Sequence, residues 1–164
     1  NFRRLKIMIP SIYNILQKFS GRDQKKSGKL ERAATIKREK KTFDQILFEK
    51  RVEDIILQYE NTDPSTLISI IDEAGKKYKK DRNENDLASY KSLLASFIIL
   101  CERKAYRIKI IKSKKDPLLE DEVDYIIVEI EKRLLALMES FILSQKQIID
   151  LIDEVEGLIF KISV

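Results

Sequence analysis

The sequence predicts an all-α protein, an antiparallel four- to five-helix bundle with an N-terminal basic helical segment. Three observations predict this fold. The second half of the chain contains three consecutive amphipathic patterns of helical period. Only 4 Gly and 3 Pro interrupt the 164 residues, and a composition rich in Ile, Leu, Lys and Glu favours long helices over a sandwich or barrel. A chain of this length can bury one substantial core.

The first predicted element is a short amphipathic helix over residues 2–19, which Pro10 should kink or start. Residues 20–41 are polar, basic and weakly periodic, which is typical of a linker. We therefore expect residues 1–42 to form a basic amphipathic segment and linker, and residues 43–164 to form the bundle domain. The apolar face of the first helix consists of Leu5, Met8, Ile9, Ile12, Ile15, Leu16 and Phe19.

The next two predicted helices are separated by a stop and a restart. An apolar pattern predicts a helix over residues 42–60. Asp63 suits an N-cap and Pro64 a first helical position, so the following helix should run from there toward residue 80. Gly75 costs this helix about 1 kcal/mol relative to alanine, so we expect it to mark a close helix contact or a break. The expected inward residues are Phe43, Ile46, Leu47, Val52, Ile55, Ile56 and Tyr59, then Leu67, Ile68, Ile71 and Ala74.

Three further helices follow. Asn83 can cap the first, whose apolar face continues without interruption to Ile111. Asp116 and Pro117 should break the chain before the second, and the third should begin near Ser144. The expected inward residues are Leu87, Tyr90, Leu94, Phe97, Ile98, Cys101, Ala105, Ile108 and Ile111, then Val123, Ile126, Ile127, Ile130, Leu134, Leu137, Met138 and Phe141, and last Ile148, Ile149, Ile152, Val155 and Ile159.

Charge is distributed unevenly along the chain. Residues 1–41 contain 13 Lys/Arg and 3 Asp/Glu, whereas residues 42–164 contain 19 and 24. Basic arms of this kind often bind nucleic acid, anionic membranes or acidic protein surfaces. Few aromatic residues accompany the arm, so base stacking has little support and contact with the phosphate backbone stays open. The candidate anion- or partner-binding residues are Arg3, Arg4, Lys6, Arg22, Lys25, Lys26, Arg32, Lys37 and Arg38.

The sequence lacks the usual residues of an enzyme site. It contains no histidine, no Gly-rich phosphate loop, no paired metal-binding cysteines and no serine nucleophile elbow. Cys101 lies at core spacing with no histidine to activate it, so we expect a buried, inert thiol. Tyr90 and Tyr106 are expected to be core residues with solvated hydroxyls rather than catalytic acids. We therefore expect no enzymatic activity, no cofactor and no metal.

Three charged clusters have structural explanations that we favour over functional ones. The acidic residues over 120–124 could suggest a divalent cation, but adjacent helical residues point apart, and acidic residues suit a helix start. The basic residues over 103–115 could bind phosphate, but cations suit a helix end. The charged residues over 72–77 should form a solvated helix face with ion pairs between residues i and i+4.

A single cysteine and the absence of any long apolar stretch predict the location of the protein. Cys101 has no second cysteine in the chain with which to form a disulfide, which favours a reducing compartment. No stretch approaches twenty apolar residues without charge, so we expect no transmembrane helix. Both observations favour the cytoplasm.

Four stretches occur in order from Phe43 onward: Leu67-Ile-Ser-Ile-Ile-Asp-Glu-Ala-Gly75, Tyr90-Lys91 before an apolar run through Phe97, the stripe from Val123 to Leu137, and Ile152-Asp-Glu-Val-Glu-Gly157-Leu158-Ile159. Their order and spacing resemble the YaaR-like family of uncharacterised bacterial proteins, over about two thirds of the chain. Residues 1–42 do not resemble the start of that family. The resemblance implies an all-helical antiparallel bundle, broadly of four-helix type, with no assigned activity and no catalytic residue to carry over. The resemblance also implies that Gly157 lies in the last helix, where its missing side chain permits another helix to cross closely.

These observations favour a non-enzymatic protein–protein interaction or adaptor module, with an unknown protein partner or a second copy of the chain. The apolar stripes are generous for so small a domain, which supports this hypothesis. The alternative is a nucleic-acid-associated accessory protein that uses its basic arm. The predicted helix over residues 2–19 has three roles open to it: it completes the bundle, lies on a membrane surface or enters a partner's groove.

Overall fold

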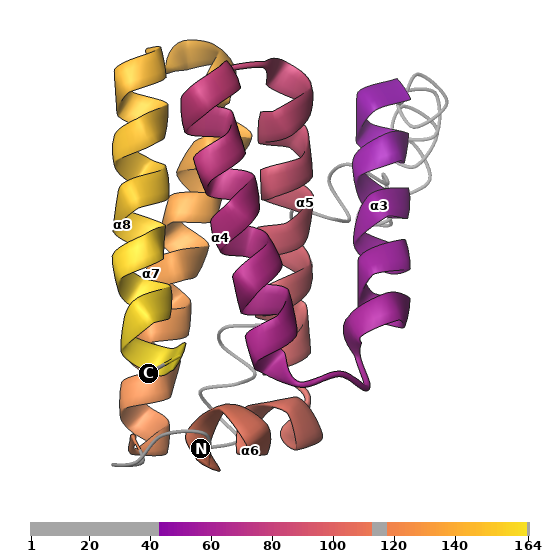
Figure 1. Ribbon diagram of the computed structural model, residues 1–164, viewed down its shortest axis with the longest axis vertical. Helices are drawn as coiled ribbons and strands as arrows, with labels where there is room; N and C mark the ends of the chain where they lie inside the picture. Colours follow the sequence, from indigo (N-terminus) through magenta and orange to yellow (C-terminus); the bar gives the residue numbers. More distant parts are fainter. Residues whose placement is uncertain (1–42, 113–117, 164) are drawn as a thin grey trace, which may run out of the picture.

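The computed structural model describes residues 43–112 and 118–163, which form an all-α bundle (Figure 1). This confirms the predicted fold class, and no strand occurs in these two ranges. Within them no helix is both long and apolar enough to cross a membrane. The elements are α3 (Phe43–Tyr59), α4 (Pro64–Asp81), α5 (Glu84–Cys101), α6 (Lys104–Lys112), α7 (Glu120–Met138), the 3-10 helix η1 (Ser140–Ile142) and α8 (Gln145–Ser163).

Helices α4, α5, α7 and α8 run alternately up and down and form a four-helix bundle, with α3 beside α5 at one edge (Figure 1). The short helix α6 lies across one end of the bundle. Helix α5 is central, because it contacts α3, α4, α6 and α7. All residues from Leu94 to Cys101 are buried, as expected for a helix that is surrounded rather than packed on one face.

The boundaries around α4 confirm the predicted caps. The Asp63 carboxylate accepts a hydrogen bond from the Ser65 backbone N–H at 2.9 Å, and this bond lowers the pKa of Asp63. Asn83 Oδ1 accepts the Asp86 N–H at 3.1 Å at the start of α5. Between these helices, Arg82 adopts a left-handed conformation with φ of 53°, and its N–H donates to Tyr78 O at 2.7 Å.

The predicted continuous helix from Asn83 to Ile111 is wrong, because the chain turns after Cys101 and α6 starts at Lys104. The turn changes which residues face inward. Tyr106 and Ile110 are buried, whereas Ala105 and Ile108, which we expected to lie inward, are exposed. A straight continuation would carry these apolar residues beyond the bundle. The turn instead places Tyr106 and Ile110 against its end.

Two further expectations about the core are wrong. Phe43 and Ile46 are exposed, because α3 lies at the edge of the bundle. Phe141 is 84% exposed, because α7 ends at Met138 and η1 carries Phe141 away from the core. The other predicted inward residues of α7 and α8 are buried or partly buried. Asp116 and Pro117, where we predicted a break, lie outside the described residues.

Candidate functional site

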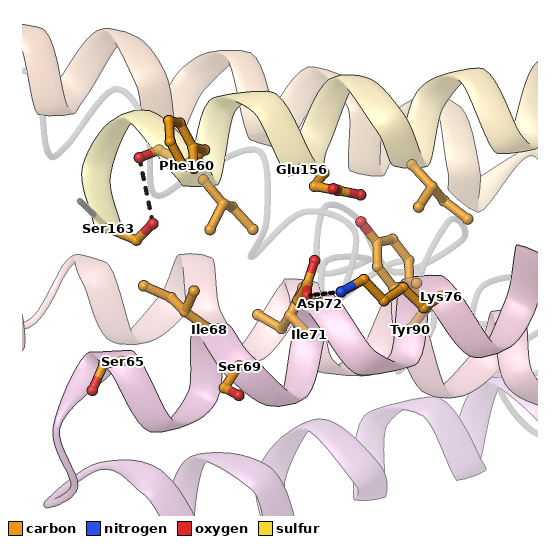
Figure 2. A pocket seen from close by; sticks show the side chains of 13 residues that line it. Ser65, Ile68, Ser69, Ile71, Asp72, Lys76, Tyr90, Glu156, Phe160 and Ser163 are labelled. Carbon is orange, nitrogen blue, oxygen red and sulfur yellow. Dashed lines mark hydrogen bonds and ion pairs between the residues drawn. The ribbon is translucent and has the colours of Figure 1, made fainter.

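A groove of about 450 Å³ lies between α4 and α8, with one residue of α5 at its floor (Figure 2). We call it the α4–α8 groove. Its lining combines isoleucines with short polar side chains and three charged ones. The lining residues are Ser65, Ile68, Ser69, Ile71, Asp72, Gly75 and Lys76 of α4, Tyr90 of α5, and Ile152, Glu156, Ile159, Phe160 and Ser163 of α8.

The apolar lining comes from both walls at helical spacing. On α4, Ile68 and Ile71 are three residues apart, and on α8, Ile152 and Ile159 are seven apart. Ile68 is partly exposed, and Phe160 is 64% exposed at the end of the groove that also holds Ser65 and Ser163 (Figure 2). Both walls therefore leave apolar side chains accessible.

At the other end of the groove, Gly75 brings three helices together. A Cβ atom at Gly75 would lie 3.1 Å from Ile152 Cγ2 and 3.3 Å from Tyr90 Cε1. This confirms the predicted close helix contact at Gly75. The corresponding expectation for Gly157 is wrong, because a Cβ atom there would meet nothing within 4 Å. Gly157 is exposed, so no helix crosses it among the described residues.

Charged side chains lie on both walls of the groove. Lys76 Nζ lies 3.0 Å from Asp72 Oδ2, and this bond raises the pKa of Lys76. Glu156 accepts a hydrogen bond from Lys79 Nζ at 3.2 Å, and Lys79 also pairs with Asp153. The predicted ion pair between residues i and i+4 is therefore present at Asp72 and Lys76, but these residues also line a groove.

The Tyr90 hydroxyl faces the groove on the side of Glu156 (Figure 2). Burial raises the pKa of Tyr90, and the carboxylates of Glu156 and Asp72 raise it further. Tyr90 therefore stays neutral and offers a hydrogen-bonding group in an otherwise apolar floor. It is a core residue, as expected, since only 2% of it is exposed.

The other candidates from the sequence occupy different places. The nine basic residues from Arg3 to Arg38 lie outside the described residues. Cys101 is fully buried, and burial raises the pKa of its thiol, as expected of an inert cysteine. The Tyr106 hydroxyl is buried and has no hydrogen-bond partner in the described part of the chain, so the expectation that it is solvated is wrong.

The basic residues over 103–115 and the acidic residues over 120–124 each contribute one side chain to a buried ion pair. Arg107 of α6 forms an ion pair with Asp124 of α7, and both side chains are almost fully buried. Arg107 also donates to the Glu120 backbone oxygen at 3.3 Å. Neither cluster is therefore only a solvated helix end. This pair could not be predicted from the sequence, because the turn that brings α6 against α7 was itself not predicted.

Periodicity does not predict the groove, because its four isoleucines all have core spacing, and all but Ile68 are in fact buried. One weak signal was present. Ser65 and Ser69 alternate with apolar residues on α4, and short polar side chains of this kind leave neighbouring apolar surface uncovered.

The family model described as "Protein of unknown function (DUF327)" matches residues 15–163. The chain is a member of the DUF327 family. The resemblance to YaaR-like proteins agrees with this membership. The expectation that residues 1–42 stand apart from the family is wrong for residues 15–42, which the match includes. No curated protein and no solved structure matches this DUF327 chain significantly.

Proposed function

We propose that this DUF327 protein is a non-enzymatic interaction module whose α4–α8 groove binds an amphipathic helix of a partner protein. One observation carries the proposal: two antiparallel helices leave an open groove in which Ile68 is partly exposed and Phe160 is exposed (Figure 1). Apolar grooves between helices are common binding sites for amphipathic helices of partner proteins.

The spacing of the lining residues supports a helix as the occupant. The isoleucines of the lining are three apart on α4 and seven apart on α8, intervals that match the ridges of a third helix. Ser65, Ser69 and Ser163 are short, so a helix backbone can approach both walls closely at that end. The bound helix would then pack against α4 and α8 as an additional helix of the bundle.

The charges of the groove support a helix with basic flanks. Its lining contains two carboxylates, Asp72 and Glu156, and one ammonium group, Lys76. With the adjacent Lys79 and Asp153 included, three carboxylates face two ammonium groups, and a cationic side chain on the occupant would face this excess, which favours the correct partner and orientation. We therefore infer an occupant with apolar residues at i, i+3 or i+4, and i+7, flanked by Lys or Arg.

Several observations support a role without catalysis. The chain has no histidine. Burial raises the pKa of Cys101, which leaves its thiol unreactive.

We place the protein in the cytoplasm, because a lone buried cysteine suits a reducing compartment.

Site-specific photo-crosslinking in the native cell tests the proposal. A photoreactive amino acid replaces Phe160 in the full chain, and a matched variant carries it at Leu57, which is 70% exposed on α3 outside the groove. Mass spectrometry then identifies the crosslinked peptides. We expect Phe160, but not Leu57, to capture one segment with the apolar and basic pattern described above. Identical captures at both positions, or a crosslink from Phe160 to residues 2–19 or to a second copy, would contradict a partner helix.

A second candidate function rests on the basic arm. The excess of Lys and Arg over residues 1–41 supports contact with nucleic-acid phosphates. Binding of a duplex oligonucleotide to the full chain should then weaken steeply as salt increases, and Arg3→Gln/Arg4→Gln/Lys6→Gln should reduce that salt dependence. Binding that does not respond to salt would exclude this role.

A further inference from the structure

A second hollow, of about 570 Å³, is lined by residues near the connection between α4 and α5. Figure 1 shows this connection at one end of the bundle. Five helices and η1 contribute to the hollow, and we call it the α3–α5 pocket. Its volume is within the range of small-molecule sites. The lining residues are Leu47, Phe48 and Arg51 of α3, Tyr78 of α4, Arg82 at its end, Glu84, Asn85, Leu87, Ala88, Lys91 and Ser92 of α5, Met138 of α7, Ser140 and Phe141 of η1, Leu143 between η1 and α8, and Gln145 and Ile148 of α8.

Three cations from separate parts of the fold line this pocket. They are Arg51, Arg82 and Lys91, and Glu84 is the one carboxylate in the lining. Neither arginine forms an ion pair with any residue of the described ranges. Lys91 Nζ donates to Ser140 Oγ at 3.2 Å, which connects α5 to η1. Apart from Lys91, which is already engaged, the lining holds two arginines and one carboxylate, a net charge of about +1.

The rest of the lining is largely apolar. Phe48 and Met138 are partly buried against the core, whereas Phe141 is 84% exposed at the pocket. An aromatic side chain so exposed provides a surface on which an apolar or aromatic group can pack. The pocket thus pairs unoccupied guanidinium groups with an apolar surface.

We propose that the α3–α5 pocket binds a small phosphorylated molecule with an apolar body, with the phosphate held by Arg51 and Arg82 and the body packed against Phe141. A phosphate monoester carries a charge of about −2 at neutral pH, which is opposite in sign to the charge of the lining. Guanidinium groups bind phosphate oxygens through paired hydrogen bonds. This inference is independent of the α4–α8 groove, because the two sites share no lining residue.

Titration of the isotopically labelled full chain, followed by amide chemical shifts, tests the proposal. Three probes separate the contributions of the phosphate group and of the apolar group to binding affinity. They are inorganic phosphate, hexyl phosphate and adenosine monophosphate. We expect saturable shifts at Arg82 and in the first turns of α5, with at least one organic phosphate binding about tenfold more tightly than inorganic phosphate. The two organic probes distinguish an aliphatic from an aromatic body.

Substitutions locate the binding groups. Arg51→Gln and Arg82→Gln should each weaken organophosphate binding about tenfold, because each removes a charge-assisted hydrogen bond. Lys50→Gln is the matched control, since Lys50 is an exposed cation on α3 that does not line the pocket, and it should leave binding unchanged. Phe141→Ala should remove the advantage of the organic probes over inorganic phosphate.

Three results would overturn the proposal. The first is no saturable shift with any probe at millimolar concentration. The second is equal weakening by Lys50→Gln and Arg51→Gln, which would indicate a general effect of charge. The third is equal affinity for inorganic phosphate and both organic probes, which would show that the apolar surface does not contribute.

Discussion

The junction of α5, α6 and α7 and the α4–α8 groove use the same kinds of residue in opposite ways. At the junction, Arg107 and Asp124 are buried and form an ion pair with each other inside the protein. In the groove, three charged side chains line a space that is open to solvent, beside the exposed Phe160 and the partly exposed Ile68 (Figure 2). Burial, not residue type, therefore distinguishes a charged side chain that stabilises the fold from one that can contact a partner.

The largest expected effect comes from the junction. Arg107→Met should destabilise the protein by about 3–5 kcal/mol, because it leaves Asp124 buried without its cation. Arg107→Met/Asp124→Leu should recover most of the loss, since no buried charge remains. Urea unfolding of the full chain measures both. A loss below about 1 kcal/mol for the single variant would show that Asp124 is not buried as described.

A matched pair of glycines tests the closed end of the groove. Gly75→Leu should cost about 1–3 kcal/mol, because the new side chain would overlap Ile152 and Tyr90. Gly157→Leu should stabilise the protein by about 0.5–1 kcal/mol, because Gly157 is exposed in a helix and leucine favours helix. Thermal unfolding compares the two. Equal effects at both positions would contradict the close contact at Gly75.

Glu102 makes the stability of the junction depend on pH. Burial, and secondly the nearby Glu131, raises the pKa of Glu102 from 4.5 to about 8. The folded state therefore binds a proton that the unfolded state has released, so this contribution to stability is complete below pH 4.5 and is lost as pH rises through about 8. Glu102→Gln should remove this decline, measured as unfolding free energy against pH. An unchanged slope in the variant would assign the decline to another group.

The smallest change in stability is expected from a substitution at Arg82, at the end of α4. Arg82 has a φ of 53°, a conformation that glycine adopts without cost. Arg82→Gly should therefore raise stability by about 0.5–1 kcal/mol in chemical denaturation. The same variant should weaken organophosphate binding in the α3–α5 pocket. A loss of stability would instead indicate that the Arg82 side chain makes a stabilising contact.

The sequence was sufficient to predict the helices, the caps at Asp63 and Asn83 and most of the core, because each depends on local chemistry or on helical periodicity. The turn at residues 102–103 could not be predicted in this way. The apolar pattern around it is compatible with one long helix, and only packing against the end of the bundle favours a turn.

The two candidate sites were harder to predict for a related reason. Ile68 has the same spacing as the core residues of α4, and only the separation of α4 from α8 leaves it partly exposed in a groove. Arg51, Arg82 and Lys91 are far apart in the sequence, and the fold brings them to one pocket. Periodicity shows which face of a helix is apolar but not whether a neighbour covers it completely.

The most direct test of the groove is the affinity of a synthetic peptide, made from the segment crosslinked at Phe160, for three forms of the full chain. These are the unmodified chain, Ser69→Arg and Thr66→Arg; both substituted residues are exposed on α4, but only Ser69 lines the groove. We predict that Ser69→Arg weakens binding at least about tenfold by filling the groove, whereas Thr66→Arg leaves it within about twofold. Equal affinity for all three forms would contradict the assignment of the α4–α8 groove as the partner site.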